Sequence, residues 1–268
     1  MRAIIYPQDF FNFEEDRRKL DPLIGDSFTI ESRILGEERE IYVYLPQGLE
    51  ESCEIYPVIY LLDGHSLHNV VSSFVQHYSG RDRIPHLIVV SIASTDRMRD
   101  FTPTMRAVSR EGPPAGGGAD DFIAFLADEL FPEVEARYPT RDYRVLIGHS
   151  LGGLFTVHAM AARPELFRAY LACSPWFGED DDALISEVES HLKEGPPKSK
   201  LLYIAHEPIG RKGIEERIDK LVEVLKRNER EHFEWNYKRY EDADHSNLPL
   251  KAIPDALDFF FPGIVQDR

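Results

Sequence analysis

Apolar runs recur along this chain between segments of helical periodicity, and this alternation constrains the fold more than any other feature. Continuous apolar runs suit strands that are buried on both faces of a sheet. Strands that alternate with helices form a mostly parallel sheet with helices on both faces. The sequence therefore predicts an α/β fold, with strands at 57–63, 87–92, 143–147, 169–174 and 200–205 and helices that include 120–130, 154–163 and 214–228.

Both ends of the chain add elements to this pattern. Residues 27–35 and 39–45 alternate between apolar and polar side chains, which predicts an antiparallel hairpin that turns at Gly36. The segment HFEWNYKRY predicts a late strand, and a C-terminal helix is expected from about Leu248. There is no internal repeat or low-complexity linker, so the 268 residues are expected to form a single domain with a core over about 27–262.

Charge and composition restrict the partners and the location. The net charge of −16 argues against nucleic acid and against an anionic membrane surface as partners. No apolar run approaches the roughly 18 residues of a membrane span. The first residues lack a basic-then-apolar leader, and two cysteines make no disulfide framework. We expect a cytoplasmic protein; the oligomeric state cannot be read from the sequence.

The stretch VLIGHSLGG at 145–153 fits the pattern G-x-S-x-G with Ser150 at its centre. In α/β hydrolases this pattern forms a sharp turn from strand to helix, and the serine sits at the strained corner. Gly148 and Gly152 would stand where a Cβ presses on a neighbouring strand or helix. The alternative is an ordinary strand–turn–helix junction with an incidental serine.

A serine nucleophile needs a base and a group that orients the base. In α/β hydrolases the chain order is serine, acid, histidine. His245 lies in a polar loop after the last predicted strand, and Glu207 follows the strand KLLYIAH directly. We expect His245 as the base and Glu207 as the acid, with Asp242 and Asp244 as alternative acids and a Ser–His dyad as a third possibility.

An oxyanion hole requires two backbone N–H groups aimed at the developing alkoxide. One is expected from Leu151, directly after the nucleophile. The other is expected from the loop LLDGH after an early strand, where Gly64 lets the backbone turn and His65 supplies its amide.

With these segments in order, the chain resembles the Putative esterase family of α/β hydrolases, which includes siderophore esterases, esterase D, feruloyl esterases and mycolyltransferases. The matching segments are YPVIYLLDGH, IPHLIVVSI, TDRMRDFTPT, GGADDFIAFLADELFPEVEARYPT, YRVLIGHSLGGLF, RPELFRAYLACSPWF and DADHSNLP. The resemblance implies Ser150 as nucleophile, His245 as base, and the amides of His65 and Leu151 as oxyanion donors. Glu207 matches the family acid by its place after a strand, although His206 stands where the family usually has glycine.

Several further residues are candidates for contact with a substrate. The segment 94–119 is long for a loop and is expected to overhang the site, where its arginines could bind anionic oxygens; the alternative for Arg99 is a pair with Asp100 that holds the loop. An apolar wall beside Ser150, or plain core packing, is expected of the aromatic pair that follows the strand at 169–174. The candidates are Arg97, Arg99, Arg106, Trp176 and Phe177.

The sequence favours no metal or other cofactor. His65 and His68 have a spacing of three, but no third ligand joins them. The leading hypothesis is thus a cofactor-free serine carboxylic ester hydrolase that acts on a small-molecule ester. The candidates are a siderophore trilactone, a feruloyl or acetyl sugar ester, or a short acyl ester. The alternatives are an acyltransferase with the same acyl-enzyme, or a catalytically silent hydrolase fold that acts as a binding module.

Overall fold

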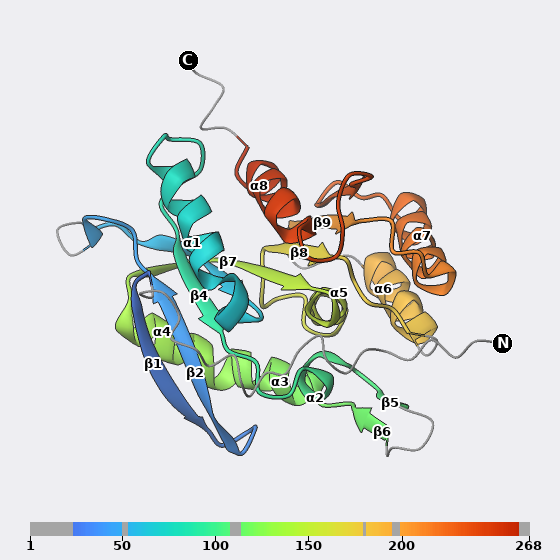
Figure 1. Ribbon diagram of the computed structural model, residues 1–268, viewed down its shortest axis with the longest axis horizontal. Helices are drawn as coiled ribbons and strands as arrows, with labels where there is room; N and C mark the ends of the chain where they lie inside the picture. Colours follow the sequence, from blue (N-terminus) through green and yellow to red (C-terminus); the bar gives the residue numbers. More distant parts are fainter. Residues whose placement is uncertain (1–23, 50–52, 108–113, 179–180, 195–198, 263–268) are drawn as a thin grey trace.

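A computed structural model describes residues 24–49, 53–107, 114–178, 181–194 and 199–262, and in it eight strands form one sheet (Figure 1). The strand order is β1-β2-β4-β3-β7-β8-β9-β10. The strands are β1 (Asp26–Ser32), β2 (Glu37–Tyr44), β3 (Tyr56–Leu61), β4 (Ile88–Ile92), β7 (Thr140–His149), β8 (Ala169–Cys173), β9 (Lys200–His206) and β10 (Phe233–Arg239). The predicted strands are all present, with ends that differ by a few residues.

The sheet is parallel except at its N-terminal edge. β1 and β2 form the predicted antiparallel hairpin, which turns at Gly36 with φ +69°. β2 is also antiparallel to β4. Every other neighbouring pair, from β4 and β3 to β9 and β10, is parallel. The carboxyl ends of β3, β7, β8 and β9 therefore meet at one edge, and loops at such an edge are where α/β folds place their sites.

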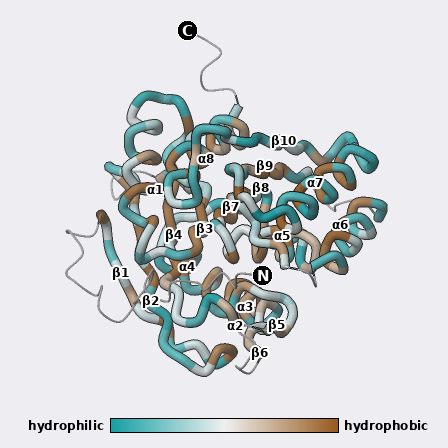
Figure 2. Tube along the Cα trace, turned by 45° about the vertical axis from the view of Figure 1, so that its right-hand side comes forward, coloured by the Kyte–Doolittle hydropathy of each residue, from teal (hydrophilic) through white to brown (hydrophobic). Residues whose placement is uncertain are grey.

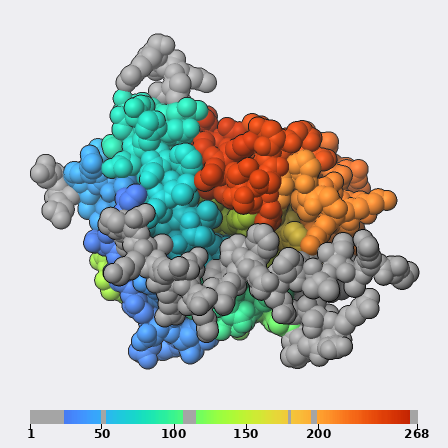
Figure 3. Space-filling view, viewed as in Figure 1, coloured from blue at the N-terminus to red at the C-terminus, as the bar shows by residue number. Residues whose placement is uncertain are grey.

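Helices cover both faces of the sheet (Figure 1). Two apolar clusters, one on each face, contain the buried side chains of these helices. On one face lie α1 (Gly64–Ser79) and α8 (Leu248–Phe260), side by side in Figure 3 as the cyan and red regions. On the other face lie α3 (Ala119–Phe125), a π-helical stretch η3 (Leu126–Leu130), α4 (Phe131–Arg137), α5 (Leu151–Ala162), α6 (Asp182–Glu194) and α7 (Lys212–Arg227).

Successive side chains of the central strands enter opposite clusters, as the alternation of a strand requires. In β3, Tyr60 joins one cluster and Leu61 the other, and both are fully buried. In Figure 2, β3 and β9 are largely brown, whereas α7 alternates between brown and teal because only one side of it faces the sheet. The strands are therefore buried on both faces, as their continuous apolar runs predict.

The segment 94–119 differs from the expected long loop. It contains a short helix, α2 (Arg97–Phe101), and a hairpin of β5 (Met105–Ala107) and β6 (Pro114–Gly116). The Asp96 side chain accepts a hydrogen bond from the Arg99 backbone N–H and thereby caps α2. Residues 108–113 of this segment lie outside the described residues, as do 1–23 and 263–268. The single-domain organisation of 1–268 stays a prediction.

In the described part of the chain, no helix is long and apolar enough to cross a membrane.

Candidate active site

Ser150 sits at a strained corner between β7 and α5. Its φ is +62°, a backbone conformation that side chains other than glycine adopt rarely and at a cost of roughly 1–3 kcal/mol. Three backbone hydrogen bonds hold the corner. Ser150 N–H donates to the carbonyl of Cys173 (2.9 Å), and the Ser150 carbonyl accepts from the N–H groups of Leu154 (3.0 Å) and Trp176 (3.1 Å). The predicted elbow is thus the observed local structure.

The glycines around Ser150 are required to different degrees. A Cβ on Gly148 would lie 2.1 Å from the carbonyl oxygen of Gly152, and a Cβ on Gly153 would lie 2.6 Å from that of Cys173. A Cβ on Gly152 would be 3.3 Å from the side chain of Leu62, which is tight but near an ordinary contact. Gly148 therefore behaves as predicted, whereas Gly153, rather than Gly152, is the second position that excludes a side chain.

Glu207 and His245 form a hydrogen-bonded pair beside this corner. His245 Nδ1 lies 2.8 Å from Glu207 Oε1, and Ser174 Oγ donates to the same oxygen at 3.1 Å. Glu207 is 2% exposed, whereas the His245 side chain is 44% exposed. Burial alone would raise the pKa of the Glu207 carboxyl, but hydrogen bonds from His245, the backbone and Ser174 outweigh burial and lower the pKa. The acid is therefore ionised at neutral pH and accepts the Nδ1 proton.

The alternative acids point elsewhere. Asp242 forms an exposed ion pair with Lys251 at 2.7 Å. Asp244 accepts hydrogen bonds from the backbone N–H groups of Ser246 (2.9 Å) and Asn247 (3.0 Å). Among the described residues, neither carboxylate contacts His245. The geometry pairs His245 with Glu207.

The His245 ring packs against the ring of His149, the residue before Ser150. The rings of His149 and His245 lie 4.4 Å apart between centroids. Burial, with a further contribution from His245, lowers the pKa of His149 to about 3, so His149 stays neutral and packs rather than exchanging protons at neutral pH. Within the described part of the chain, Ser150 Oγ makes no hydrogen bond to His245; in ligand-free hydrolases such contacts often shorten only in the complex.

The two predicted oxyanion amides lie in the first turns of helices. Leu151 is the first residue of α5, and His65 is the second residue of α1. Early N–H groups of a helix have no acceptor within the helix, and the helix dipole favours negative charge there. Asp63, in the turn from β3 into α1, has φ +56°. A Cβ on Gly64 would lie 2.8 Å from the Ser91 carbonyl carbon. The loop is thus pressed against the end of β4.

Two of the candidate arginines are engaged with carboxylates of the chain. Arg97 forms an ion pair with Asp63 at 2.7 Å. Arg99 pairs with Asp100 and with Glu37, each at 2.8 Å, which agrees with the loop-holding alternative. The backbone of Arg106 lies in β5 opposite Ala115, and its side chain is outside the described part. Contact of these arginines with a substrate stays a prediction.

The aromatic pair after β8 separates into two environments. The Trp176 ring meets the His245 ring edge-on at 5.9 Å between centroids, and the Arg211 guanidinium lies 4.7 Å from the Trp176 ring centroid. Phe177 is fully buried in the core, which favours its packing alternative. Trp176 is therefore the member of the pair that borders the site.

His68, one of the two histidines considered as metal ligands, has structural hydrogen-bond partners. His68 Nδ1 lies 2.8 Å from Ser91 Oγ, and its Nε2 lies 3.0 Å from the Ile24 carbonyl oxygen. Both ring nitrogens are thus used to tie α1 to β4 and to the start of the described chain.

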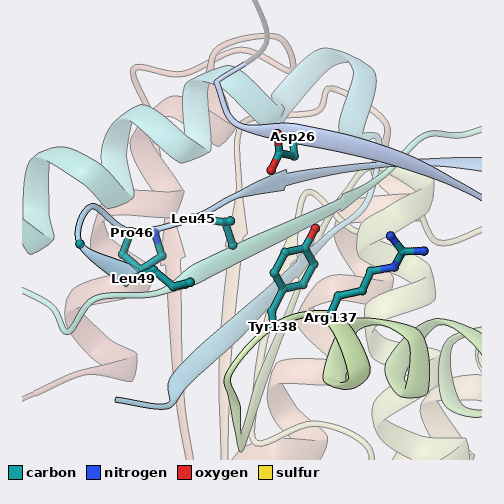
Figure 4. Close-up of a pocket in the computed structure, with 7 residues that line it drawn as sticks. Asp26, Leu45, Pro46, Leu49, Arg137 and Tyr138 are labelled. Atoms are coloured by element: carbon teal, nitrogen blue, oxygen red, sulfur yellow. The ribbon is translucent and has the colours of Figure 1, made fainter. Parts of the chain in front are cut away.

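A separate pocket of about 510 Å³ is shown in Figure 4. Its lining includes Asp26 at the start of β1, Leu45 after β2, and Tyr138 just before β7. Ser150 follows the far end of β7, a ten-residue strand that spans about 30 Å. This pocket is therefore not part of the Ser150 site.

Comparison with known proteins identifies the family of the chain. The model of the family described as Putative esterase matches residues 32–247. A Bacillus subtilis protein named ferri-bacillibactin esterase BesA is 37% identical over 137 residues, which are 45% of this chain and 47% of that protein. A siderophore enterobactin esterase of Emericella nidulans is 31% identical over 153 residues, which are 50% of this chain and 50% of that protein. The chain thus matches about half the length of these relatives.

Among solved structures, an IroE-like serine hydrolase from Shewanella oneidensis is 31% identical and superposes with a TM-score of 0.81. The match covers 88% of this chain and 79% of that one. The fold is accordingly that of the α/β hydrolases, with the N-terminal hairpin added at one edge of the parallel sheet. Fold and sequence match together show that the chain belongs to the Putative esterase family.

Proposed function

We propose that this chain is a serine carboxylic ester hydrolase whose nucleophile is Ser150. The observation that carries the proposal is the Glu207–His245 hydrogen bond of 2.8 Å, placed beside a serine held at φ +62°. A histidine that donates its Nδ1 proton to a carboxylate presents a basic Nε2, which is the nitrogen that can accept a proton from serine. The names of the relatives as esterases support the same reaction.

The proposed reaction proceeds through an acyl-enzyme. Ser150 Oγ attacks the ester carbonyl while His245 Nε2 takes the hydroxyl proton, and the negative charge on the carbonyl oxygen is met by the amides of Leu151 and His65. His245 then protonates the departing alcohol as the C–O bond breaks. Water attacks the acyl-enzyme with His245 again as base, which releases the acid and restores Ser150. Glu207 stabilises the imidazolium in both halves.

For the substrate, we propose a siderophore ester. The relatives named for ferri-bacillibactin and for enterobactin support this choice. Trp176, with Arg211 against its ring, offers an aromatic and cationic surface beside His245 that suits aromatic, electron-rich acyl groups.

The test is a panel of esters assayed with purified protein: a triscatecholate trilactone with and without ferric ion, a feruloyl sugar ester and short-chain acyl esters. We expect hydrolysis of the trilactone with the highest kcat/KM, and covalent labelling of the protein by a fluorophosphonate. A higher kcat/KM for the feruloyl or short acyl esters would show that the substrate is not a siderophore ester. Absence of both hydrolysis and labelling would favour the silent binding module.

A further inference from the structure

The Asp63 carboxylate, just after β3, accepts three side-chain hydrogen bonds near the proposed oxyanion amides. Arg97 Nε donates to Asp63 Oδ1 at 2.7 Å, and Arg97 Nη2 donates to Oδ2 at 3.0 Å. Ser94 Oγ adds a third hydrogen bond to Oδ1 at 2.8 Å. Asp63 is 6% exposed and the Arg97 side chain is 29% exposed, so this charge-assisted bidentate pair is partly shielded from water.

The same guanidinium also reaches the serine corner. Arg97 Nη2 lies 3.4 Å from the carbonyl oxygen of His149, the residue before Ser150. One side chain therefore contacts both strand-to-helix turns, the one that ends β3 and the one that ends β7. These two strands are neighbours in the sheet.

Helix α2, which carries Arg97, is itself anchored to β2. Asp100 and Arg39 are both fully buried and form an ion pair at 2.9 Å. Arg99 pairs with Glu37 at 2.8 Å, so two residues of α2 are tied to β2. Breaking a buried charge pair leaves an uncompensated charge, which makes this attachment hard to loosen. These contacts fix α2, and α2 in turn fixes the position of Arg97 beside the site.

The position of the Asp63 carboxylate also makes its charge consequential. A Cβ on Gly152 would lie 3.6 Å from Asp63 Oδ2, which places this oxygen against the first turn of α5. Leu151 stands one residue before Gly152, and His65 stands two residues after Asp63. The carboxylate is therefore near both proposed oxyanion amides, and without a cation beside it would oppose negative charge on a substrate oxygen.

We propose that Arg97 is a positioning residue of the esterase site, acting through Asp63. It holds the loop that carries the His65 amide in register with the Ser150 corner, and it cancels the charge of Asp63 next to the oxyanion. This inference rests on the proposed esterase chemistry at Ser150. It differs from substrate binding by Arg97 because it affects stabilisation of the transition state, and so kcat, rather than ground-state affinity.

The test compares Arg97→Met, Asp63→Asn and the double variant on one ester at one pH. Loss of a single oxyanion donor lowers kcat by about 10²–10³-fold, and we expect Arg97→Met to lower kcat by about 10²-fold with KM changed less than about threefold. Asp63→Asn removes the charge together with one side of the clamp, and a loss of about tenfold is expected. The double variant should be about tenfold more active than Arg97→Met, because no unpaired carboxylate remains.

Arg83→Met serves as the matched control. Arg83 makes a bidentate pair with Asp258 between the end of α1 and α8, remote from the loops of the site. This exposed pair contributes little, and kcat should stay within about twofold of wild type. If Arg97→Met does not fold, Arg97→Lys takes its place: it keeps the charge but not the bidentate geometry, so its kcat should be lower than that of wild type. Asp63→Asn then serves as the second test.

A rise in KM with unchanged kcat in Arg97→Met would return Arg97 to substrate binding and overturn the proposal. So would a double variant no more active than Arg97→Met, or, in the fallback, full activity of both Arg97→Lys and Asp63→Asn. A wild-type protein that neither hydrolyses esters nor reacts with a fluorophosphonate would instead overturn the proposed function, and this inference with it. An active, labelled wild type with an indifferent Arg97→Met overturns the positioning role alone.

Discussion

Two strand-to-helix turns meet at the candidate site, and they differ in what their side chains do. The turns after β3 and β7 each place a residue other than glycine in the left-handed region, Asp63 at φ +56° and Ser150 at φ +62°. At Ser150 the backbone is anchored by hydrogen bonds and the hydroxyl is left for chemistry. At Asp63 the backbone carbonyl likewise accepts hydrogen bonds, from the N–H groups of Ser66 and Leu67, but here the side chain is anchored too, by Arg97 and Ser94. The group proposed to act at this turn is the backbone amide of His65, two residues after Asp63.

A positive φ at a residue other than glycine thus serves different purposes at the two turns. Strained residues persist only where the surroundings hold them, so the holding contacts indicate which group must stay in place. Ser174, after β8, is a third case with φ +47°: its N–H donates to the Ala205 carbonyl at 2.6 Å, and its hydroxyl supports Glu207. Three neighbouring strands thus end in strained residues at the edge where the site lies.

The largest expected effect comes from removing the Ser150 hydroxyl. We predict that Ser150→Ala lowers kcat by about 10⁴-fold or more, as loss of a triad nucleophile does in other hydrolases. The melting temperature should change little, because the backbone contacts of the corner remain. Ser174→Ala is the matched control; it removes a buried hydroxyl from a similar strained corner and should retain a far larger share of activity. If Ser150→Ala kept more than a tenth of wild-type activity, Ser150 would not be the nucleophile.

The next effect concerns the acid. Glu207→Gln should lower kcat by up to about 10⁴-fold with little change in KM, because an amide no longer fixes the Nδ1-protonated tautomer or stabilises the imidazolium. Asp242→Asn and Asp244→Asn, measured on the same ester, should keep most of the activity since their carboxylates bond to other groups. Near-wild-type activity in Glu207→Gln would favour a Ser–His dyad, and a collapse in either aspartate variant alone would move the acid to the histidine loop.

A third prediction tests whether the Ser150 turn depends on close backbone approach. Gly148→Ala should lower the free energy of unfolding by about 3 kcal/mol, since the new Cβ would press on a backbone carbonyl. Gly152→Ala should cost less, because its nearest neighbour is the end of the Leu62 side chain. Denaturant unfolding of both variants checks this order. Equal losses would mean that the corner relaxes freely.

The smallest expected effect is on thermal stability and comes from Glu37, which helps to anchor α2 near the Asp63 turn. Burial alone would raise the pKa of Glu37, but hydrogen bonds from Arg99 and Thr95 and the charge of Arg39 lower it from its ordinary 4.5 to about 2. A lowered pKa in the folded state stabilises the protein above pH 4.5, and this contribution is lost as pH falls toward 2.

We therefore expect Glu37→Gln to melt a few degrees below wild type at pH 7, with the gap narrowing below pH 4.5 and closing near pH 2. Melting curves across this range check the sign. A gap that widens in acid would show that Glu37 does not stabilise the fold as an anion.

Local patterns predicted the parts of the molecule that depend on near neighbours in sequence. The apolar runs at 143–147 and 169–174 became central strands because a strand buried on both faces needs no polar positions. The glycines around Ser150 predicted the elbow. The places of His245 and Glu207 after strands predicted them as base and acid. The pairing of His245 with Glu207, rather than with Asp242 or Asp244, was only a first choice from the sequence, and the structure supplies the contact.

The parts that the sequence did not predict depend on contacts between distant segments. Arg97 and Asp63 are 34 residues apart, and nothing in DRMRDF distinguishes an arginine that binds substrate from one that binds a carboxylate of the chain. Helix α2 is only five residues long, too short for a periodic signal. Ser174 reads as the end of an apolar strand, and its support of Glu207 appears only when β8 and β9 lie side by side.

We propose that the Ser150 turn supplies a side chain, and the Asp63 turn a backbone amide, to the same reacting carbonyl. A crystal structure of the protein after reaction with a fluorophosphonate tests this most directly. We predict a phosphonyl group on Ser150 Oγ, with its oxygen about 2.7–3.1 Å from the backbone nitrogens of both Leu151 and His65. A phosphonyl oxygen turned away from His65, or an adduct on another residue, would contradict the account.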